Sequence, residues 1–336
     1  MRALLCVEPG RLEIVDRPRP SPRAGEALVR VRRCGVCGTD YHIFEGSHPY
    51  LDYPRVIGHE LSGEIAEIGP GCKSAVGDEI VVVPYLSCGT CVACRHGKPN
   101  CCQRIAVLGV HVDGGLAEYV CVPETNVAAA EGVTLDQAAM VEFLSIGAHA
   151  VRRANPRRGD RVLVVGVGPI GVGCAIFAKA RGGSVTALDM RGDRLAFSRD
   201  LLKVDHTVVA GGDALAALSE LTGGDLFEVV IDAAGRASSI CVGFDYVAHG
   251  GTYVLVSVVR DAISFADPAF HAREMSLLGS RNATRDDFLE VLRAIREGLV
   301  PTGALATHRA SLERSPERFA EWIKPETGVI KALIEV

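Results

Sequence analysis

The chain has 336 residues, of which 48% are hydrophobic and 23% are charged, and its formal net charge is −5. This is an ordinary globular composition, and the chain is longer than one hydrophobic core usually fills, so we expect two domains. The acidic balance, with no stripe of Lys and Arg, argues against nucleic acid as a partner.

The first residues, MRALLCVEPGRLEIVD, lack the organisation of a secretory signal, because Glu, Pro and Gly interrupt a short apolar stretch. We therefore expect a cytoplasmic protein. The chain contains 12 cysteines. Because cytosolic thiols are kept reduced, these cysteines indicate metal binding or catalysis rather than a disulfide framework.

Residues 1 to about 140 hold short Val and Ile runs separated by Gly and Pro, a pattern that predicts a β-rich, barrel-like domain. Within it lie Cys37 in CGVCGTDYH, then His59 and Glu60 in GHE, and then Glu142 in VEFLSIG. Thiolates, imidazoles and carboxylates are the ligand types that zinc accepts. Each residue alone has a packing explanation, but their scatter along the chain suits an open, catalytic metal site.

A second cysteine pattern lies in the segment CGTCVACRHGKPNCC, which spaces Cys88, Cys91 and Cys94 evenly and ends in Cys101 and Cys102. Four thiolates can enclose one zinc ion in a closed tetrahedral site, whose role would be to stiffen the loop. Spacing leaves open whether Cys101 or Cys102 is the fourth ligand. Free thiols would be prone to oxidation, and an iron–sulfur cluster lacks any surrounding electron-relay feature.

From Gly159 onward, strand-like and helix-like segments alternate, which predicts a parallel sheet with crossover helices. Residues 162–180, VLVVGVGPIGVGCAIFAKA, are apolar enough to be mistaken for a membrane span. Their Gly and Pro residues predict instead a buried strand, a glycine turn and a helix, so we expect no membrane partner.

The same segment places Gly166, Gly168 and Gly171 as GxGxxG directly after a strand, and Asp189 ends the next strand. In this context the motif predicts a dinucleotide site, with the pyrophosphate at the helix N-terminus and the adenosine ribose on Asp189. Because a carboxylate repels a ribose 2′-phosphate, NAD is favoured over NADP. Arg191 or Arg194 could pair with a 2′-phosphate, although Arg194 could instead lie along the adenine ring.

Near the C-terminus, RDDFLEVLRAIREGL reads as one amphipathic helix. The apolar residues at helical spacing are Phe288, Leu289, Leu292, Ile295 and Leu299. The final segment, GVIKALIEV, is too short to fold alone, so we expect it to pack back onto the first domain.

These residues together resemble the zinc-containing medium-chain dehydrogenase family, which includes alcohol, sorbitol and threonine dehydrogenases. The matching elements are GVCGTDYH, GHE, the four-Cys loop, DGGLAEYV, GVGPIG and the acid at Asp189, over nearly the full length. The resemblance implies an α/β fold with a GroES-like β-rich catalytic domain, residues 1–142 and 281–336. Inserted in it is a Rossmann NAD-binding domain, residues 143–280, with a doubly wound parallel sheet. A homodimer or homotetramer is also implied.

Carried onto this sequence, the resemblance implies two zinc ions per chain and NAD. Cys37 and His59 become ligands of a catalytic zinc, and Glu60 becomes a nearby carboxylate that can approach the metal. The third ligand is a Cys in alcohol dehydrogenases and a Glu in polyol dehydrogenases, so Glu142 favours polyols and related acids. Cys88, Cys91, Cys94 and Cys102 become the structural zinc site, and Gly166, Gly168, Pro169, Ile170, Gly171, Asp189 and Arg194 become the cofactor site.

A zinc ion at the catalytic site acts as a Lewis acid that lowers the pKa of a substrate hydroxyl. Thr39 and His42 resemble the family's relay of protons to solvent; an ordinary loop histidine is the alternative for His42. We expect Asp40 to support the zinc-bound His59 on the side of the ring that faces away from the metal.

The stretches SIGAHAVRRA and DPAFHAREMSLLGSRNAT are similar to a bacterial branch of the family that oxidises L-galactonate or L-gulonate at carbon 5. A sugar acid needs a cation for its carboxylate, which Arg281, or Arg152 and Arg153, could supply; solvated surface arginines are the other explanation. A polyol such as sorbitol and L-threonine are the alternative substrates. A different class of function is a non-catalytic nucleotide-binding protein of the same fold.

Overall fold

The protein separates into two compact units in a computed structural model that describes residues 1–48 and 51–336. The first unit comprises Met1–Glu142, Thr284–Gly298 and Thr302–Val336, and the second comprises Phe143–Ala283 and Leu299–Pro301. Both ends of the chain therefore contribute to the first unit. The mixed α/β fold class predicted from the sequence is confirmed.

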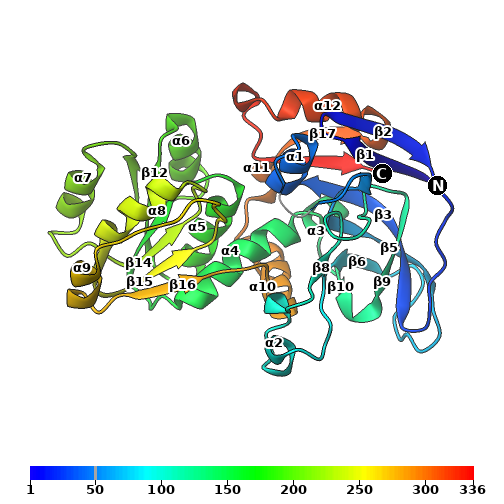
Figure 1. Ribbon diagram of the computed structural model, residues 1–336, viewed down its shortest axis with the longest axis horizontal. Coiled ribbons are helices and arrows are strands. Elements are labelled where there is room, and N and C mark those ends of the chain that lie inside the picture. Colours follow the sequence, from blue (N-terminus) through cyan, green and yellow to red (C-terminus); the bar gives the residue numbers. More distant parts are fainter. Residues whose placement is uncertain (49–50) are drawn as a thin grey trace. The chain divides into compact units, whose positions relative to one another are not determined.

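The first unit contains mainly short strands with a few helices around them (Figure 1). Its strands are β1 (Arg2–Glu8), β2 (Arg11–Asp16), β3 (Glu26–Val36), β4 (Arg55–Val56), β5 (Glu60–Ile68), β6 (Glu79–Val82), β7 (Tyr85–Leu86), β8 (Ala106–Val107), β9 (Tyr119–Pro123), β10 (Val127–Ala129), β17 (Ala306–Ser311) and β18 (Lys331–Glu335). Its helices are α1 (Gly38–Phe44), α2 (Val92–Arg95), α3 (Leu135–Ala138), α10 (Arg285–Arg296), α11 (Thr302–Leu305) and α12 (Ser315–Trp322).

Strand β3 organises the main sheet of this unit, whose order is β10-β6-β5-β3-β18-β17, with β9 also paired to β3. Both β5 and β18 run antiparallel to β3, with Gly35 opposite Glu60 and Val36 opposite Ala332. In Figure 1 the red C-terminal strand accordingly lies beside the blue β3. The carboxyl end of β3 therefore meets the first residues of β5 and β18, and this edge of the sheet positions the site described below.

Helix α10 buries a narrower face than its sequence pattern predicts. Phe288, Leu292 and Ile295 are buried as expected. Leu289 and Leu299 are 43% and 51% exposed, so their assignment to the apolar face is wrong. Each residue turns an α-helix by about 100°, which carries Leu289 away from the face of Phe288, and Leu299 lies beyond the last helical residue, Arg296.

An ion-pair cluster joins three elements of the first unit. Asp136 of α3 accepts hydrogen bonds from Arg33 of β3, at 2.6 Å, and from Arg309 of β17. Partial burial raises the pKa of this carboxyl, but Arg309 and Arg33 outweigh that effect and hold the pKa of Asp136 below its ordinary value. The negative charge of Asp136 therefore stabilises the folded state.

The second unit is a six-stranded sheet of order β13-β12-β11-β14-β15-β16, in which every neighbouring pair is parallel. Its strands are β11 (Arg161–Val165), β12 (Ser184–Asp189), β13 (His206–Val209), β14 (Phe227–Asp232), β15 (Val247–Leu255) and β16 (Ser276–Gly279). Its helices are α5 (Pro169–Ala180), α6 (Gly192–Asp200), α7 (Ala214–Leu221), α8 (Ala237–Gly243) and α9 (Asp267–Ala272), and α4 (Val141–Ala154) leads into it.

The strand, glycine turn and helix predicted for residues 162–180 are confirmed as β11, Gly166–Gly168 and α5. Val162, Leu163 and Val164 are fully buried, which explains the uninterrupted apolar run of this central strand. Among the described residues, no helix has both the length and the apolar character that crossing a membrane requires.

Candidate functional site

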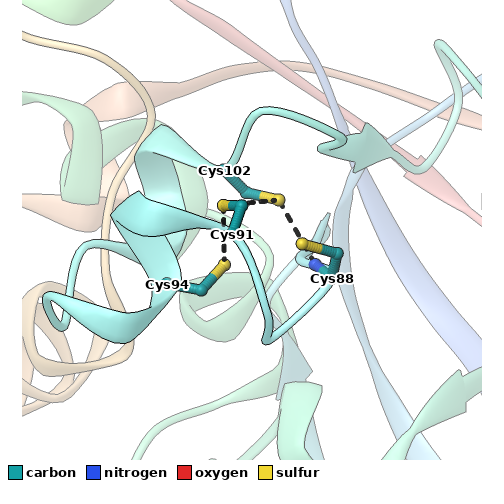
Figure 2. Close-up of side chains that lie close together, drawn as sticks. All are labelled: Cys88, Cys91, Cys94 and Cys102. Atoms are coloured by element: carbon teal, nitrogen blue, oxygen red, sulfur yellow. Dashed lines mark hydrogen bonds between the residues drawn. The ribbon is translucent and has the colours of Figure 1, made fainter.

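The cysteine loop gathers four sulfur atoms at one point (Figure 2). Cys91 precedes α2 and Cys94 lies on it, and their sulfur atoms are 3.5 Å apart. The sulfur of Cys102 lies 3.9 Å from that of Cys91 and accepts a hydrogen bond from the backbone N–H of Cys88 at 3.3 Å. Cys102 is 1% exposed, whereas Cys101 is exposed and lies outside the group, so the geometry selects Cys102 from the adjacent pair.

Backbone N–H groups around the loop favour thiolates. Hydrogen bonds from the backbone of Thr90 and Cys91 lower the pKa of Cys88 to about 5, and those from Cys94 and Gln103 lower the pKa of Cys91. Desolvation instead raises the pKa of Cys94 to about 11. Four thiol groups packed this closely are the donor set of a closed tetrahedral zinc site.

A second group of donors lies at the edge of the main sheet, where the ligand atoms of Cys37, His59 and Glu60 are within 4.8 Å of one another. Cys37 follows β3 and caps α1, and His59 and Glu60 stand at the start of β5, which pairs with β3. The antiparallel pairing therefore brings together residues that are separate in the sequence. His59 and Glu60 are 5% and 0% exposed, so these polar groups need partners in the interior.

Asp40 lies next to His59 in the interior. Its buried carboxylate accepts hydrogen bonds from the backbone N–H groups of Cys37, at 2.9 Å, and Gly58, at 3.2 Å. Its Oδ1 lies 3.8 Å from Nδ1 of His59, which makes no hydrogen bond. Burial opposes a charged imidazole, but Asp40 and Cys37 outweigh it and raise the pKa of His59. With Nδ1 facing Asp40, Nε2 is the ring nitrogen left for a metal.

Glu60 is paired with Lys331, a residue that the sequence analysis missed. The Nζ atom of Lys331 donates to both carboxylate oxygens, at 2.6 and 2.7 Å, and to the carbonyl oxygen of Val36 at 3.1 Å. Lys331 is 1% exposed. The available signal was a single Lys directly before the apolar residues ALI of the last strand-like segment, because a buried charge requires a partner.

Glu142, at the start of α4, lies outside the 4.8 Å group but close enough that its charge contributes to raising the pKa of His59. It is 4% exposed, and burial raises the pKa of its carboxyl. The hydroxyl of Tyr85 donates a hydrogen bond to Oε1 of Glu142. Tyr85 also escaped the sequence analysis, because an isolated Tyr carries no spacing signal.

Thr39 and His42 lie one turn apart on α1, and residues three apart share a helix face. The His42 side chain is 63% exposed, and its Nδ1 lies 3.2 Å from the hydroxyl of Ser47. Of the arginines considered for a substrate carboxylate, Arg281, Arg152 and Arg153 are all exposed residues of the second unit.

The glycine motif of the second unit lies where β11 ends. Gly166 has φ +80°, and a Cβ there would lie 2.7 Å from Cα of Ala234. A Cβ on Gly171 would lie 1.9 Å from the carbonyl oxygen of Gly166. Only glycine fits either position, and α5 begins with Gly168 as its cap and Pro169 at its start. The free N–H groups of this helix end can face an anion.

Asp189 ends β12, adjacent to the glycine turn because Val165 pairs with Leu188. Its carboxylate accepts hydrogen bonds from the backbone N–H groups of Val167, at 2.8 Å, and Arg191, at 2.9 Å. Nη1 of Arg194 lies 3.9 Å from Oδ2 of Asp189. Each carboxylate oxygen can accept further hydrogen bonds, so Asp189 can still bind ribose hydroxyls.

The donor types of the two clusters fit zinc ions in different roles. Four sulfur donors fill a tetrahedral shell, whereas one thiol, one imidazole and carboxylates can leave a position open for a substrate. In the second unit, the glycine turn before α5 and the acid that ends β12 have the arrangement that dinucleotide sites use.

Comparison with known proteins agrees with this chemistry. Residues 23–132 match the alcohol dehydrogenase GroES-like domain, and residues 169–297 match the zinc-binding dehydrogenase family. L-galactonate-5-dehydrogenase of Escherichia coli K12 is 39% identical over 335 residues, which cover 99% of this chain and 98% of that protein. Sorbitol dehydrogenase of Halalkalibacterium halodurans is 31% identical, with coverage of 96% and 94%.

A solved structure of a short chain alcohol dehydrogenase from Escherichia coli CFT073, complexed with the cofactor NADH, superposes with a TM-score of 0.94. It is 32% identical and the match covers 100% of this chain and 99% of that one. Identity at this level over the full length shows common descent as well as a common fold. The chain therefore belongs to the zinc-type medium-chain alcohol dehydrogenase family and is a zinc-containing, NAD-linked oxidoreductase of alcohols or polyols.

Proposed function

We propose that this enzyme oxidises the carbon-5 hydroxyl of a sugar acid, L-galactonate or L-gulonate, to a ketone, with NAD⁺ as the acceptor. The observation that carries the proposal is the 39% identity to an L-galactonate-5-dehydrogenase over nearly the whole chain. The buried carboxylate of Glu142 supports it, because a Glu at this point of the sequence resembles the ligand set of polyol dehydrogenases.

The proposed catalytic zinc ligands are Cys37, His59 and Glu142. Zinc at this site supplies a Lewis acid that makes a substrate hydroxyl more acidic. Asp40 holds the His59 ring, and Lys331 neutralises Glu60 beside the site. Cys88, Cys91, Cys94 and Cys102 are proposed to hold a second, structural zinc ion, so the expected content is two zinc ions per chain.

The proton released from the substrate hydroxyl is proposed to pass along Thr39 and His42 to solvent. Their positions one turn apart on α1 and the exposure of His42 support this path. The nicotinamide cofactor is proposed to bind over Gly166, Gly168, Pro169, Ile170 and Gly171, with Asp189 on the adenosine ribose and Arg194 along the adenine. A carboxylate at Asp189 favours NAD over NADP.

Arg281 is the proposed partner of the substrate carboxylate, because a guanidinium binds a carboxylate with two parallel hydrogen bonds. Replacing it tests the choice between sugar acids and neutral polyols. We expect Arg281→Ala to raise the KM for L-galactonate about tenfold or more, because a hydrogen bond to a charged group contributes about 1.5–3 kcal/mol. The KM for sorbitol should stay unchanged. Arg157→Ala, which removes another exposed arginine of the same unit, is the control.

The deciding experiment is a substrate panel followed by NADH absorbance: L-galactonate, L-gulonate, their 5-keto products, sorbitol and L-threonine, each with NAD and NADP. The proposal predicts the highest kcat/KM for one of the two sugar acids with NAD⁺. Turnover of sorbitol or L-threonine with none of either sugar acid refutes it. Oxidation of a neutral polyol is the second candidate, and the 31% identity to a sorbitol dehydrogenase favours it.

We also propose that the enzyme is a homodimer or homotetramer in which cofactor domains pair through edge strands. Among the described residues, β13 and β16 are the edges of the parallel sheet, where unpaired backbone groups can join another strand. Light scattering of the purified protein distinguishes these assemblies from a monomer, and a monomeric mass refutes the proposal.

A further inference from the structure

Tyr85 has no part in the roles proposed so far, yet its hydroxyl donates a hydrogen bond to Oε1 of Glu142. Both side chains are nearly inaccessible to solvent, with 7% of Tyr85 and 4% of Glu142 exposed. Water therefore cannot replace the hydroxyl easily if it is removed. A hydrogen bond to a charged acceptor in such surroundings is among the stronger ones in proteins.

The Tyr85 side chain is held in one place by its own neighbours. Asn126 donates from Nδ2 to the carbonyl oxygens of Val83, at 2.7 Å, and Tyr85, at 3.0 Å, which fixes the backbone of β7. The ring packs edge-on against Phe288 of α10, with centroids 6.3 Å apart and an interplanar angle of 82°. Because backbone and ring are both fixed, the direction of the hydroxyl is fixed as well.

The partner of this hydroxyl is the carboxylate of Glu142, a long side chain that loses rotamer freedom when it is held in one place. A carboxylate has two oxygens, each able to accept. Because Oε1 accepts from Tyr85, Oε2 is the oxygen that remains for a metal ion. A side chain that is already ordered before the metal binds loses less conformational entropy on binding. The hydrogen bond from Tyr85 therefore leaves one oxygen of the buried Glu142 carboxylate available to a metal ion.

We propose that Tyr85 is a positioning residue that holds Glu142 by one oxygen so that the other can bind the catalytic zinc. This inference rests on the proposed role of Glu142 as the third ligand. It assigns to β7 a part in metal binding that no motif of the sequence indicates.

The test measures zinc affinity in the holoenzyme for the wild type, Tyr85→Phe and Tyr253→Phe. The Phe at position 85 keeps the ring packing and removes only the hydroxyl. Tyr253 is a matched control in the second unit, 0% exposed, whose hydroxyl donates to the carbonyl oxygen of Ile240 at 3.1 Å. Each protein is dialysed against graded chelator, and the zinc retained per chain is measured by atomic emission.

We expect Y85F to release one zinc ion with an affinity lowered about 10–100-fold, the usual effect of losing a hydrogen-bond partner of a metal ligand. The second zinc ion stays bound as in the wild type, and Y253F behaves as the wild type. In cobalt-substituted protein, the visible absorption of the catalytic site shifts in Y85F alone. Unchanged chelator curves and spectra in Y85F overturn the proposal.

Glu142→Ala separates a failure of this inference from a failure of the proposed ligand set. If E142A keeps wild-type affinity, Glu142 is not a ligand and the proposed ligand set fails. If E142A weakens binding but Y85F does not, only the role of Tyr85 fails. If both weaken it, the double variant must bind no more weakly than E142A, because Tyr85 acts through Glu142; fully additive losses overturn the proposal.

Discussion

Lys331 gives the most quantitative prediction, because its ammonium group is buried in an ion pair with the carboxylate of Glu60. The exposed fractions are 1% for Lys331 and 0% for Glu60, and Nζ lies 2.6 and 2.7 Å from the two oxygens. Lys331→Met keeps the length of the side chain but leaves the Glu60 carboxylate buried without its cation. Removing one partner of a buried ion pair costs about 3–5 kcal/mol.

A double variant isolates the charge as the cause. In Lys331→Met with Glu60→Gln, neither charge remains, and replacing both members of a buried pair with neutral groups is often close to neutral for stability. We therefore expect the double variant to recover most of the free energy of unfolding that K331M loses. The losses of the two single variants should be strongly non-additive.

Unfolding of the first unit can be followed by the fluorescence of a single tryptophan. Trp322 is the one Trp of the sequence, is 4% exposed and lies in the first unit with Lys331 and Glu60. Its fluorescence during urea unfolding therefore reports the unit that carries the pair. The measurement is made with zinc-loaded protein and after zinc removal, because an ion in the proposed catalytic site would compensate part of the lost charge. If K331M unfolds at the same urea concentration as the double variant in both states, the reasoning is refuted.

Four other replacements test the remaining assignments. Cys37→Ser should lower the zinc content by one ion per chain and abolish turnover, with the unfolding midpoint measured by Trp322 fluorescence largely unchanged. Cys91→Ser should remove the other zinc ion and lower that midpoint. If both variants are unfolded, the two zinc roles are unsupported. Asp189→Ala should reduce kcat/KM for NAD about 10–100-fold and shift the preference toward NADP, because it removes hydrogen-bond acceptors for the ribose hydroxyls and a negative charge. An unchanged ratio of kcat/KM for NAD to kcat/KM for NADP would count against the role of Asp189 in binding the ribose. Because the pKa of Asp136 is lowered on folding, its contribution is present above its unfolded pKa and is lost as the pH falls through its lower folded value. Asp136→Asn should therefore cost about 1 kcal/mol in urea unfolding at pH 7 and nothing at a pH below both values; an equal cost at both pH values would contradict the assignment.

Much of the second unit could be predicted from local sequence alone. Each signal depends on a few neighbouring residues. The apolar run before Gly166 predicts β11, the glycine spacing predicts the turn into α5, and the acid at Asp189 marks the end of β12. Spacing within one short loop likewise groups Cys88, Cys91 and Cys94. It could not choose between Cys101 and Cys102, because neighbouring residues differ only in which one the folded loop turns inward.

The sequence by itself determined the ligand types, the dinucleotide turn and the membership of the family, because these depend on residue identity and short spacing. The tertiary structure decided which distant groups meet. Lys331 and Glu60 are separated by 271 residues and Tyr85 and Glu142 by 57, and each pair is joined only after strands or helices pack. Sheet order places the start of β18 beside the end of β3, and no local pattern encodes that order. The contacts of Lys331 with Glu60 and of Tyr85 with Glu142 are therefore revealed only by the folded chain.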